Sequence, residues 1–165
     1  MCIEFQTKGN SIGEGIAKGI NEAIDIAERD GWNGIVIGNN EKQFSVGANL
    51  MNMGMMAMQK NFDEIEKFLV GFQKILMRMR TCNVPVVSAT HGFVMGGGLE
   101  VSIHCDAGIH ASESYIGLVE AGVGLIPGGG GTKEMAMRAS DSFNSGDVKM
   151  PSLIDHFKSI AMGSV

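Results

Sequence analysis

The 165-residue sequence predicts a single domain of the α/β class. Two observations support this prediction, and a third, the distribution of glycine, indicates unusual backbone or a nearby ligand. Short apolar runs rich in β-branched residues alternate along the chain with stretches of amphipathic, helical periodicity. Hydrophobic residues make up 44% of the chain, which is enough to fill one buried core. Many of the 24 glycines gather at positions 96–98 and 122–131, where the backbone must adopt unusual dihedral angles or approach a ligand closely.

The first half of the chain contains a helix, a strand and an apolar segment. Over residues 16–27, apolar side chains recur at spacings of three and four while charged residues fill the other faces, which indicates an amphipathic helix. The β-branched run at 34–38 is bounded by glycines and suits a buried strand, and 39–42 form a turn. Residues 44–50 lead away from this strand. The methionine-rich segment that follows, 51–58, suits a pliable apolar wall.

The second half continues the alternation of helix and strand. An apolar stripe with Asn61 or Asp63 as N-cap candidate predicts a helix that ends before Asn83. No internal repeat or interior domain boundary is visible, so one domain over residues 1–165 is expected. The remaining expected elements are a strand at 85–89, a helix at 99–104, a strand at 107–111, an apolar segment around one acid at 115–127, a helix at 132–139 and a short helix at 153–162.

Composition argues against several classes of partner. Thirteen Lys and Arg against eighteen Asp and Glu give a net charge of −5, and no basic run could neutralise a row of phosphates. A nucleic-acid partner is therefore not expected. Polar residues interrupt every apolar stretch well short of a bilayer-spanning length, and the N-terminus has no signal-peptide pattern. We expect a cytoplasmic protein without a membrane span.

Cysteine and histidine show no pattern typical of a metal site or a disulfide framework. The three cysteines, Cys2, Cys82 and Cys105, are odd in number and widely spaced, and Cys105 is expected to be a buried thiol. The histidines lack metal-ligand spacing, so no bound metal is expected. They are expected to pack in the core or to lie at the surface: His91, His104, His110 and His156.

Two acidic residues stand out because of their surroundings. Three glycines at 96–98 precede a helical pattern, so free N–H groups at a helix N-terminus favour a negatively charged oxygen there. Glu100 lies in the first turn of that helix, where an acid can also serve only to complement the helix dipole. Glu120 lies within a long apolar segment, so it must be paired or have a raised pKa. If the two carboxyls meet, they suit general acid and base catalysis.

Nucleotide-binding motifs do not fit the glycine clusters. After the run at 128–131, Thr132 precedes Lys133, which reverses the order of a phosphate-binding loop. After 96–98, Val101 stands where a dinucleotide fingerprint requires a third glycine. Neither cluster therefore predicts a nucleotide site.

Three ordered motifs resemble the crotonase family of enoyl-CoA hydratases and isomerases. They are FSVGANL at 44–50, HGFVMGGGLE at 91–100, and the segment 117–132. The sequence is most similar to the crotonase-like segment fused to bacterial 3-hydroxyacyl-CoA dehydrogenases, over residues 3–139. The resemblance implies a spiral of ββα turns, assembly as a homo-trimer or hexamer, and a covalently linked dehydrogenase domain in a longer parent protein. Because family members are longer, it also implies a C-terminally truncated domain that lacks the family's C-terminal helical region.

The resemblance assigns roles to individual residues. Ala48 and Gly97 match the two positions whose backbone N–H groups form the family's oxyanion hole. Glu100 matches the acid that deprotonates water for attack at Cβ, and Glu120 matches the acid that exchanges a proton at Cα. The implied reaction is the hydration of 2-enoyl-CoA thioesters in fatty-acid β-oxidation. Coenzyme A is then part of the substrate, and no separate cofactor is expected.

Other positions contribute to the substrate site or depart from the family's pattern. Val46 matches a position that lines the adenine and pantetheine cleft, and Gly128 matches a backbone position near the catalytic water. Departures occur at His91, Asn49, Leu118 and Val119, the last two preceding the second glutamate. Two alternatives to hydration stay open: a 3,2-enoyl-CoA isomerase, or a non-catalytic acyl-CoA-binding or assembly segment beside a dehydrogenase.

Overall fold

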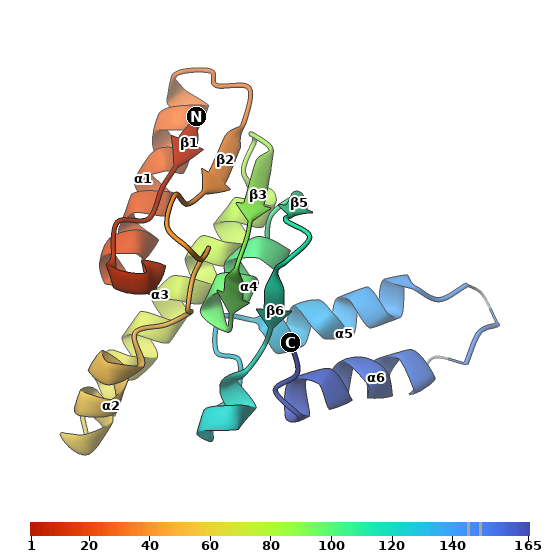
Figure 1. Ribbon diagram of the computed structural model, residues 1–165. Coiled ribbons are helices and arrows are strands. Elements are labelled where there is room, and N and C mark those ends of the chain that lie inside the picture. Colours follow the sequence, from red (N-terminus) through yellow and green to blue (C-terminus); the bar gives the residue numbers. More distant parts are fainter. Residues whose placement is uncertain (145, 149) are drawn as a thin grey trace.

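Six strands and six helices, with two short 3₁₀ turns, make up the computed structural model, which describes residues 1–144, 146–148 and 150–165 (Figure 1). The strands are β1 (Cys2–Ile3), β2 (Ile35–Gly38), β3 (Val86–Thr90), β4 (Phe93–Met95), β5 (Ala107–His110) and β6 (Tyr115–Gly117). The helices are α1 (Glu14–Arg29), α2 (Leu50–Met58), α3 (Phe62–Thr81), α4 (Gly97–Ile103), α5 (Gly131–Asp141) and α6 (Met150–Ala161). The 3₁₀ turns are η1 (Lys8–Asn10) and η2 (Glu120–Val123).

The strands form two parallel sheets that are built by successive turns of a spiral. One sheet has the order β1-β2-β3-β5, and the other pairs β4 with β6. The segments β3-β4-α4 and β5-β6-α5 are two ββα units, and each strand of the first unit pairs with its counterpart in the second. In the register, Ser88 is opposite Gly108 and Val94 is opposite Ile116. The predicted α/β spiral of ββα turns is therefore confirmed.

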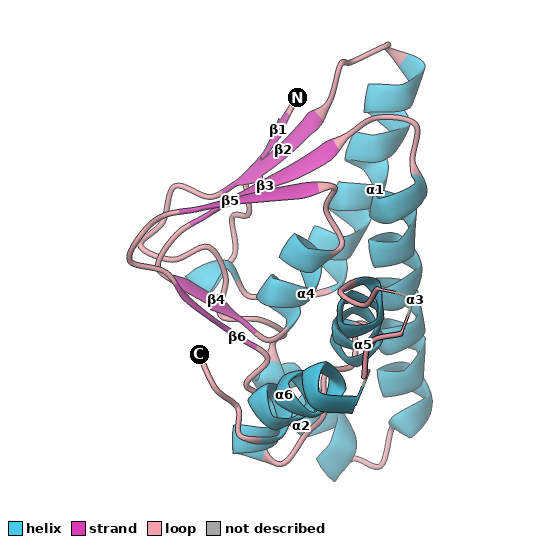
Figure 2. Cartoon of the chain, turned by 90° about the vertical axis from the view of Figure 1, so that its right-hand side faces the viewer, coloured by secondary structure: helices cyan, strands magenta, loops and turns pink. Residues whose placement is uncertain are grey.

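The main core lies between the four-stranded sheet and its helices. Figure 2 shows α1, α3 and α4 on the same side of that sheet. The alternation of a half-buried strand is clear in β2, where Ile35 and Ile37 are buried and Val36 between them is exposed. The helices contribute the apolar stripes that periodicity predicts, with fully buried side chains at Ile20, Ile24, Leu76 and Met79.

Most expected elements are present, with shifted ends. The helix expected at 99–104 begins at Gly97, so two of the three glycines lie inside α4. Asn61 is the N-cap of α3, although its side chain accepts no capping hydrogen bond. The strands β1, β4 and β6 were not expected, because two or three residues are too few to show a period. None of the described helices is both long and apolar enough to cross a bilayer.

The loop 44–49 is fastened to β4 by backbone hydrogen bonds. Ser45 N donates to Phe93 O at 3.0 Å, and Met95 N donates to Ser45 O at 3.0 Å. Gly47 has a φ of 89°, and a Cβ at this position would lie 2.8 Å from Met95 O. A glycine is thus required where the loop passes over β4. This close approach brings Ala48 beside the start of α4.

Replacing Gly47 with alanine should lower the free energy of unfolding by about 1 to 3 kcal/mol, because the added Cβ meets backbone atoms and the φ is unfavourable. Urea denaturation measures this change. Gly19→Ala is the matched control, since Gly19 lies within α1 and a Cβ there meets nothing within 4 Å. It should raise the free energy of unfolding by up to about 1 kcal/mol. Equal effects at both positions would contradict the close approach at Gly47.

Candidate active site

Two free backbone N–H groups lie side by side at the N-terminus of α4. A Cβ on Gly97 would lie 3.4 Å from Ala48 N, and a Cβ on Gly47 would lie 3.2 Å from Gly97 N. Gly97 is the first residue of α4 and has no intrahelical acceptor. In the part of the chain that the structure describes, neither Ala48 N nor Gly97 N donates to a protein acceptor. Two such donors, one from a loop and one from a helix N-terminus, can stabilise a developing oxyanion.

Glu100 is a buried carboxyl held by a glycine-rich turn. Only 2% of the residue is exposed, and its Oε1 accepts hydrogen bonds of 2.8 Å from both Gly129 N and Gly131 N. Burial raises the pKa of Glu100 to about 7, and the charge of Glu120 adds to the rise, while the backbone donors act against it. Its role therefore goes beyond complementing the dipole of α4.

Close approach explains why the turn that holds Glu100 is made of glycine. A Cβ on Gly129 would lie 2.5 Å from Glu100 Oε2, and one on Gly131 would lie 3.1 Å from Oε1. The glycine run is visible in the sequence, but it does not predict that Gly129 N and Gly131 N donate to Glu100. Gly128 directly precedes these donors, and its carbonyl accepts a hydrogen bond of 2.6 Å from Gln73 Nε2 on α3.

Glu120 lies on η2, beside the start of α4. A Cβ on Gly96 would lie 2.8 Å from Glu120 Oε1, so the carboxyl packs directly on the Gly96 backbone. Its Oε2 is buried and has no hydrogen-bond partner among the described residues, and burial raises the pKa of Glu120. Glu100 N donates to Gly96 O at 2.9 Å, so the tertiary structure places Glu100 and Glu120 around the same glycine, although sequence spacing left them apart.

Together these groups form a site for proton transfer next to an anion-stabilising pair. The amides of Ala48 and Gly97 and the carboxyls of Glu100 and Glu120 all lie at the start of α4. Glu100, with a pKa of about 7, can hold or take a proton near neutral pH, and burial shifts the pKa of Glu120 in the same direction. The arrangement suits a reaction in which a carbonyl oxygen gains negative charge while protons move at neighbouring carbons.

Two of the departures noted in the sequence have structural roles beside the site. Asn49 caps α2, because its Oδ1 accepts a hydrogen bond of 3.2 Å from Asn52 N. Leu118 is buried and packs on the glycine turn, since its methyl carbons would lie 2.9 Å from a Cβ on Gly131. Val46 is 44% exposed on the loop before Ala48, and its N–H donates to Gly9 O at 3.2 Å.

A cavity of about 550 Å³ opens between α1, α2 and α3. Its wall includes Met53 and Met56, in keeping with the pliable wall predicted for the methionine-rich segment. None of the predicted site residues lines it. Ile12 and Phe72 do line it, and both would also contact a Cβ on Gly97, at 3.6 and 3.7 Å. The cavity therefore lies next to the amide pair, with these two side chains between them.

Cysteine and histidine give this region no other reactive centre. Burial raises the pKa of Cys105 to about 12, so its thiol stays protonated. Among residues 1–144, 146–148 and 150–165, no three His, Cys, Asp or Glu side chains are grouped so that they could hold a metal ion.

Comparison with known proteins links this chain to one family. A family model described as enoyl-CoA hydratase/isomerase matches residues 1–147. A Bacillus subtilis (strain 168) protein described as a probable 3-hydroxyacyl-CoA dehydrogenase is 40% identical over 163 residues, which is 99% of this chain and 20% of that protein. A short-chain-enoyl-CoA hydratase of Clostridium acetobutylicum is 36% identical over 102 residues, which is 62% of this chain and 38% of that protein.

Solved structures support the fold. The crystal structure of an enoyl-CoA hydratase from Polaromonas sp. JS666 matches with a TM-score of 0.85 at 21% identity, over 99% of this chain and 60% of that one. The chain thus spans less than two thirds of these relatives. The predicted crotonase fold and the resemblance to a segment of bacterial 3-hydroxyacyl-CoA dehydrogenases are both confirmed.

The raised pKa of Glu100 should make stability depend on pH. Between the ordinary value of 4.5 and about 7, the folded chain keeps a proton that the unfolded chain has released, so unfolding becomes easier as pH rises. Glu100→Gln has no carboxyl to titrate, so it does not lose stability in this way. The free energy of unfolding of Glu100→Gln minus that of wild type should therefore increase by about 2 to 3 kcal/mol between pH 5 and pH 8.

Urea denaturation at both pH values measures this difference. Glu113→Gln is the control, because Glu113 is exposed. Its difference from wild type should stay constant with pH. A constant difference for Glu100→Gln as well would contradict a raised pKa at Glu100.

Proposed function

Because the chain belongs to the enoyl-CoA hydratase/isomerase family, we propose that it carries the active-site residues of a 2-enoyl-CoA hydratase acting in fatty-acid β-oxidation. One observation carries the proposal: two carboxyls with raised pKa values, Glu100 and Glu120, lie beside the free amides of Ala48 and Gly97. Hydration of an enoyl thioester needs both parts, since one oxygen gains charge while a proton leaves water and another joins carbon.

In the proposed reaction, the thioester oxygen accepts hydrogen bonds from Ala48 N and Gly97 N and is stabilised as it gains enolate charge. Glu100, as the carboxylate, takes a proton from water while the water oxygen bonds to Cβ. Glu120, as the acid, gives a proton to Cα. The Cα=Cβ double bond is replaced by a C–O and a C–H bond, and proton exchange returns both carboxyls to their starting states.

The turn around Glu100 supports this division of roles. Gly129 N and Gly131 N both donate to Oε1, which leaves Oε2 available to the attacking water. Glu120 Oε2 is buried without a protein partner, which suits a group that meets substrate. In the same proposal, Gly128 lies near the water and Val46 borders the path of coenzyme A. The reaction is redox-neutral, so coenzyme A enters as part of the substrate and no separate cofactor takes part.

The proposal extends to the whole protein. The product of hydration is a 3-hydroxyacyl-CoA, which is the substrate class in the name of the Bacillus subtilis relative. We therefore propose that residues 1–165 form one crotonase-like domain that is linked in its parent to a 3-hydroxyacyl-CoA dehydrogenase domain. Assembly as a homo-trimer or hexamer and a cytoplasmic location belong to the same proposal.

Glu100→Gln and Glu120→Gln should each lower the hydration rate by about 100- to 10,000-fold, because each removes a proton-transfer group. The assay follows the loss of absorbance of the conjugated enoyl thioester with crotonyl-CoA and a longer 2-enoyl-CoA. It is run on the full-length parent and on the 165-residue chain. Glu113→Gln, at an exposed site, should leave the rate unchanged. Ordinary hydration by either site variant would overturn the proposal.

The same variants separate hydration from the two alternatives. A 3,2-enoyl-CoA isomerase needs only one base to carry a proton, so Glu100→Gln would keep isomerase turnover while Glu120→Gln lost it. A non-catalytic segment would bind acyl-CoA without turnover in any form of the protein. Either result would replace the hydratase assignment.

A further inference from the structure

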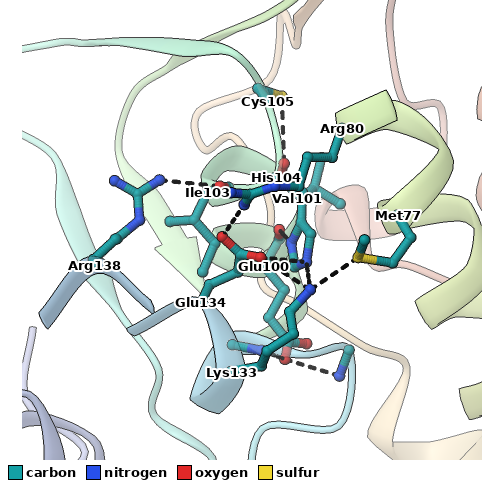
Figure 3. Close-up of polar contacts among 12 residues, drawn as sticks. Met77, Arg80, Glu100, Val101, Ile103, His104, Cys105, Lys133, Glu134 and Arg138 are labelled. Carbon is teal, nitrogen blue, oxygen red and sulfur yellow. Dashed lines mark hydrogen bonds and ion pairs between the residues drawn. The ribbon is translucent and has the colours of Figure 1, made fainter. Parts of the chain in front are cut away.

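A second buried carboxylate lies beside Glu100 and takes no part in the proposed reaction. Glu134 is in the first turn of α5, and 1% of it is exposed. Arg80, in the last turn of α3, donates a hydrogen bond to its Oε2. Lys133 Nζ lies 3.0 Å from its Oε1, and His104 Nε2 lies 3.5 Å from the same atom. Figure 3 shows these four side chains meeting next to Glu100.

The pairing holds the start of α5 against the end of α3. Burial acts to raise the pKa of Glu134, but the neighbouring cations, Lys133 and Arg80 among them, outweigh it and hold the pKa below its ordinary value. Glu134 is therefore ionised at neutral pH. Removing one partner of such a buried pair leaves an uncompensated charge. The ionic contact thus favours one position of the α5 N-terminus, and the turn at 129–131 leads directly into it.

His104 connects this cluster to the backbone of Glu100. Its Nδ1 lies 2.7 Å from Glu100 O, and because a carbonyl only accepts, Nδ1 carries the proton. Burial lowers the pKa of His104, so the ring is neutral and Nε2 accepts from Lys133 Nζ at 3.5 Å. The ring also lies 3.5 Å from the position of a Cβ on Gly130, which has a φ of 109°.

These contacts close a ring around Glu100. The carbonyl oxygen of Glu100 accepts a hydrogen bond from His104, and the His104 ring contacts Lys133 and lies next to Gly130. The neighbours of Gly130, Gly129 and Gly131, donate their N–H groups to the carboxylate of Glu100. The 129–131 turn therefore both hydrogen-bonds the carboxylate of Glu100 and packs against His104. A shift of that turn moves the two N–H donors away from Oε1.

We propose that Glu134, paired with Arg80, is a positioning residue that fixes the 129–131 turn so that Gly129 N and Gly131 N both reach Glu100 Oε1. This inference rests on the proposed function of Glu100 as the base of hydration. When the turn shifts, the ionised form of Glu100 loses two hydrogen bonds that favour it, so the pKa of Glu100 rises. The acid limb of kcat/KM against pH then moves to higher pH.

Direct charge effects have to be separated from positioning. The charged or titratable side chains around Glu100 are Glu120 on η2, His104 at the end of α4, Lys133 and Glu134 on α5, and Arg80 on α3. Glu134→Gln alone removes a negative charge and would lower the pKa of Glu100 through the field. Arg80→Met alone removes a positive charge and would raise it. The double variant removes one charge of each sign, so its effect reports the position of the turn.

The test compares wild type with Arg80→Met/Glu134→Gln in the full-length protein. The double variant should move the acid limb of kcat/KM to higher pH by about 1 unit and lower kcat by about tenfold, with KM little changed. The matched control is Arg78→Met/Asp25→Asn, which removes a 2.5 Å ion pair between α3 and α1. It should reduce stability and leave the acid limb in place. An unmoved acid limb in a folded double variant would overturn the inference.

A second readout needs no turnover. The carboxyl carbon of ¹³C-labelled Glu100, assigned by its absence in Glu100→Gln, reports its own titration by NMR. If wild type fails to hydrate enoyl-CoA, the proposed function fails, and this titration still decides the positioning role. Should the double variant not fold, Glu134→Asp keeps the charge on a shorter side chain, and its Glu100 titration should move in the same direction. An unchanged titration in folded Glu134→Asp would also overturn the inference.

Discussion

The two hydrogen bonds from Gly129 N and Gly131 N to Glu100 Oε1 are the contacts on which the rest of the site depends. A carboxyl that is almost fully buried must have partners, because an unpartnered charge in an apolar interior is strongly unfavourable. Here the partners are the backbone amides of Gly129 and Gly131, where an added Cβ would come within 3 Å of Glu100 or Leu118. This turn packs against Leu118 and leads into α5. The packing of the second ββα unit is therefore coupled to the protonation state of Glu100.

The balance between burial and hydrogen bonding sets what this acid can do. Burial alone pushes Glu100 toward the neutral form, and the backbone donors pull it back toward the ionised form, so that its pKa is about 7. Burial also raises the pKa of Glu120, but one of its oxygens has no protein partner in the described chain. Two acids with different environments lie in one site, which is the arrangement that separates a base from an acid.

Close backbone approach is the second constraint, and it explains the glycine content better than flexibility does. Gly47 passes over Met95 O, and Gly98 leaves room for Ser45, whose Cβ would lie 2.7 Å from an added Cβ. These approaches let the loop after β2 lie against the start of α4. The result is a pair of unengaged N–H groups from segments about fifty residues apart. Neither segment alone forms an anion site, because α4 is short and the loop has no regular structure.

The sequence by itself determined the α/β class, the helices α1 and α3, the strands β2 and β3, and the two glutamates as candidate site residues. Apolar periodicity and two glutamates in apolar, glycine-rich surroundings are local properties, and local properties are visible in sequence. Only the tertiary structure decided that Glu100 and Glu120 lie around Gly96, that Gly129 and Gly131 are the donors, and that Arg80 pairs with Glu134. Arg80 and Glu134 each resemble an ordinary charge at a helix end, and 54 positions separate them. Their burial and pairing follow from how the second ββα unit packs on α3, and no local pattern encodes that packing.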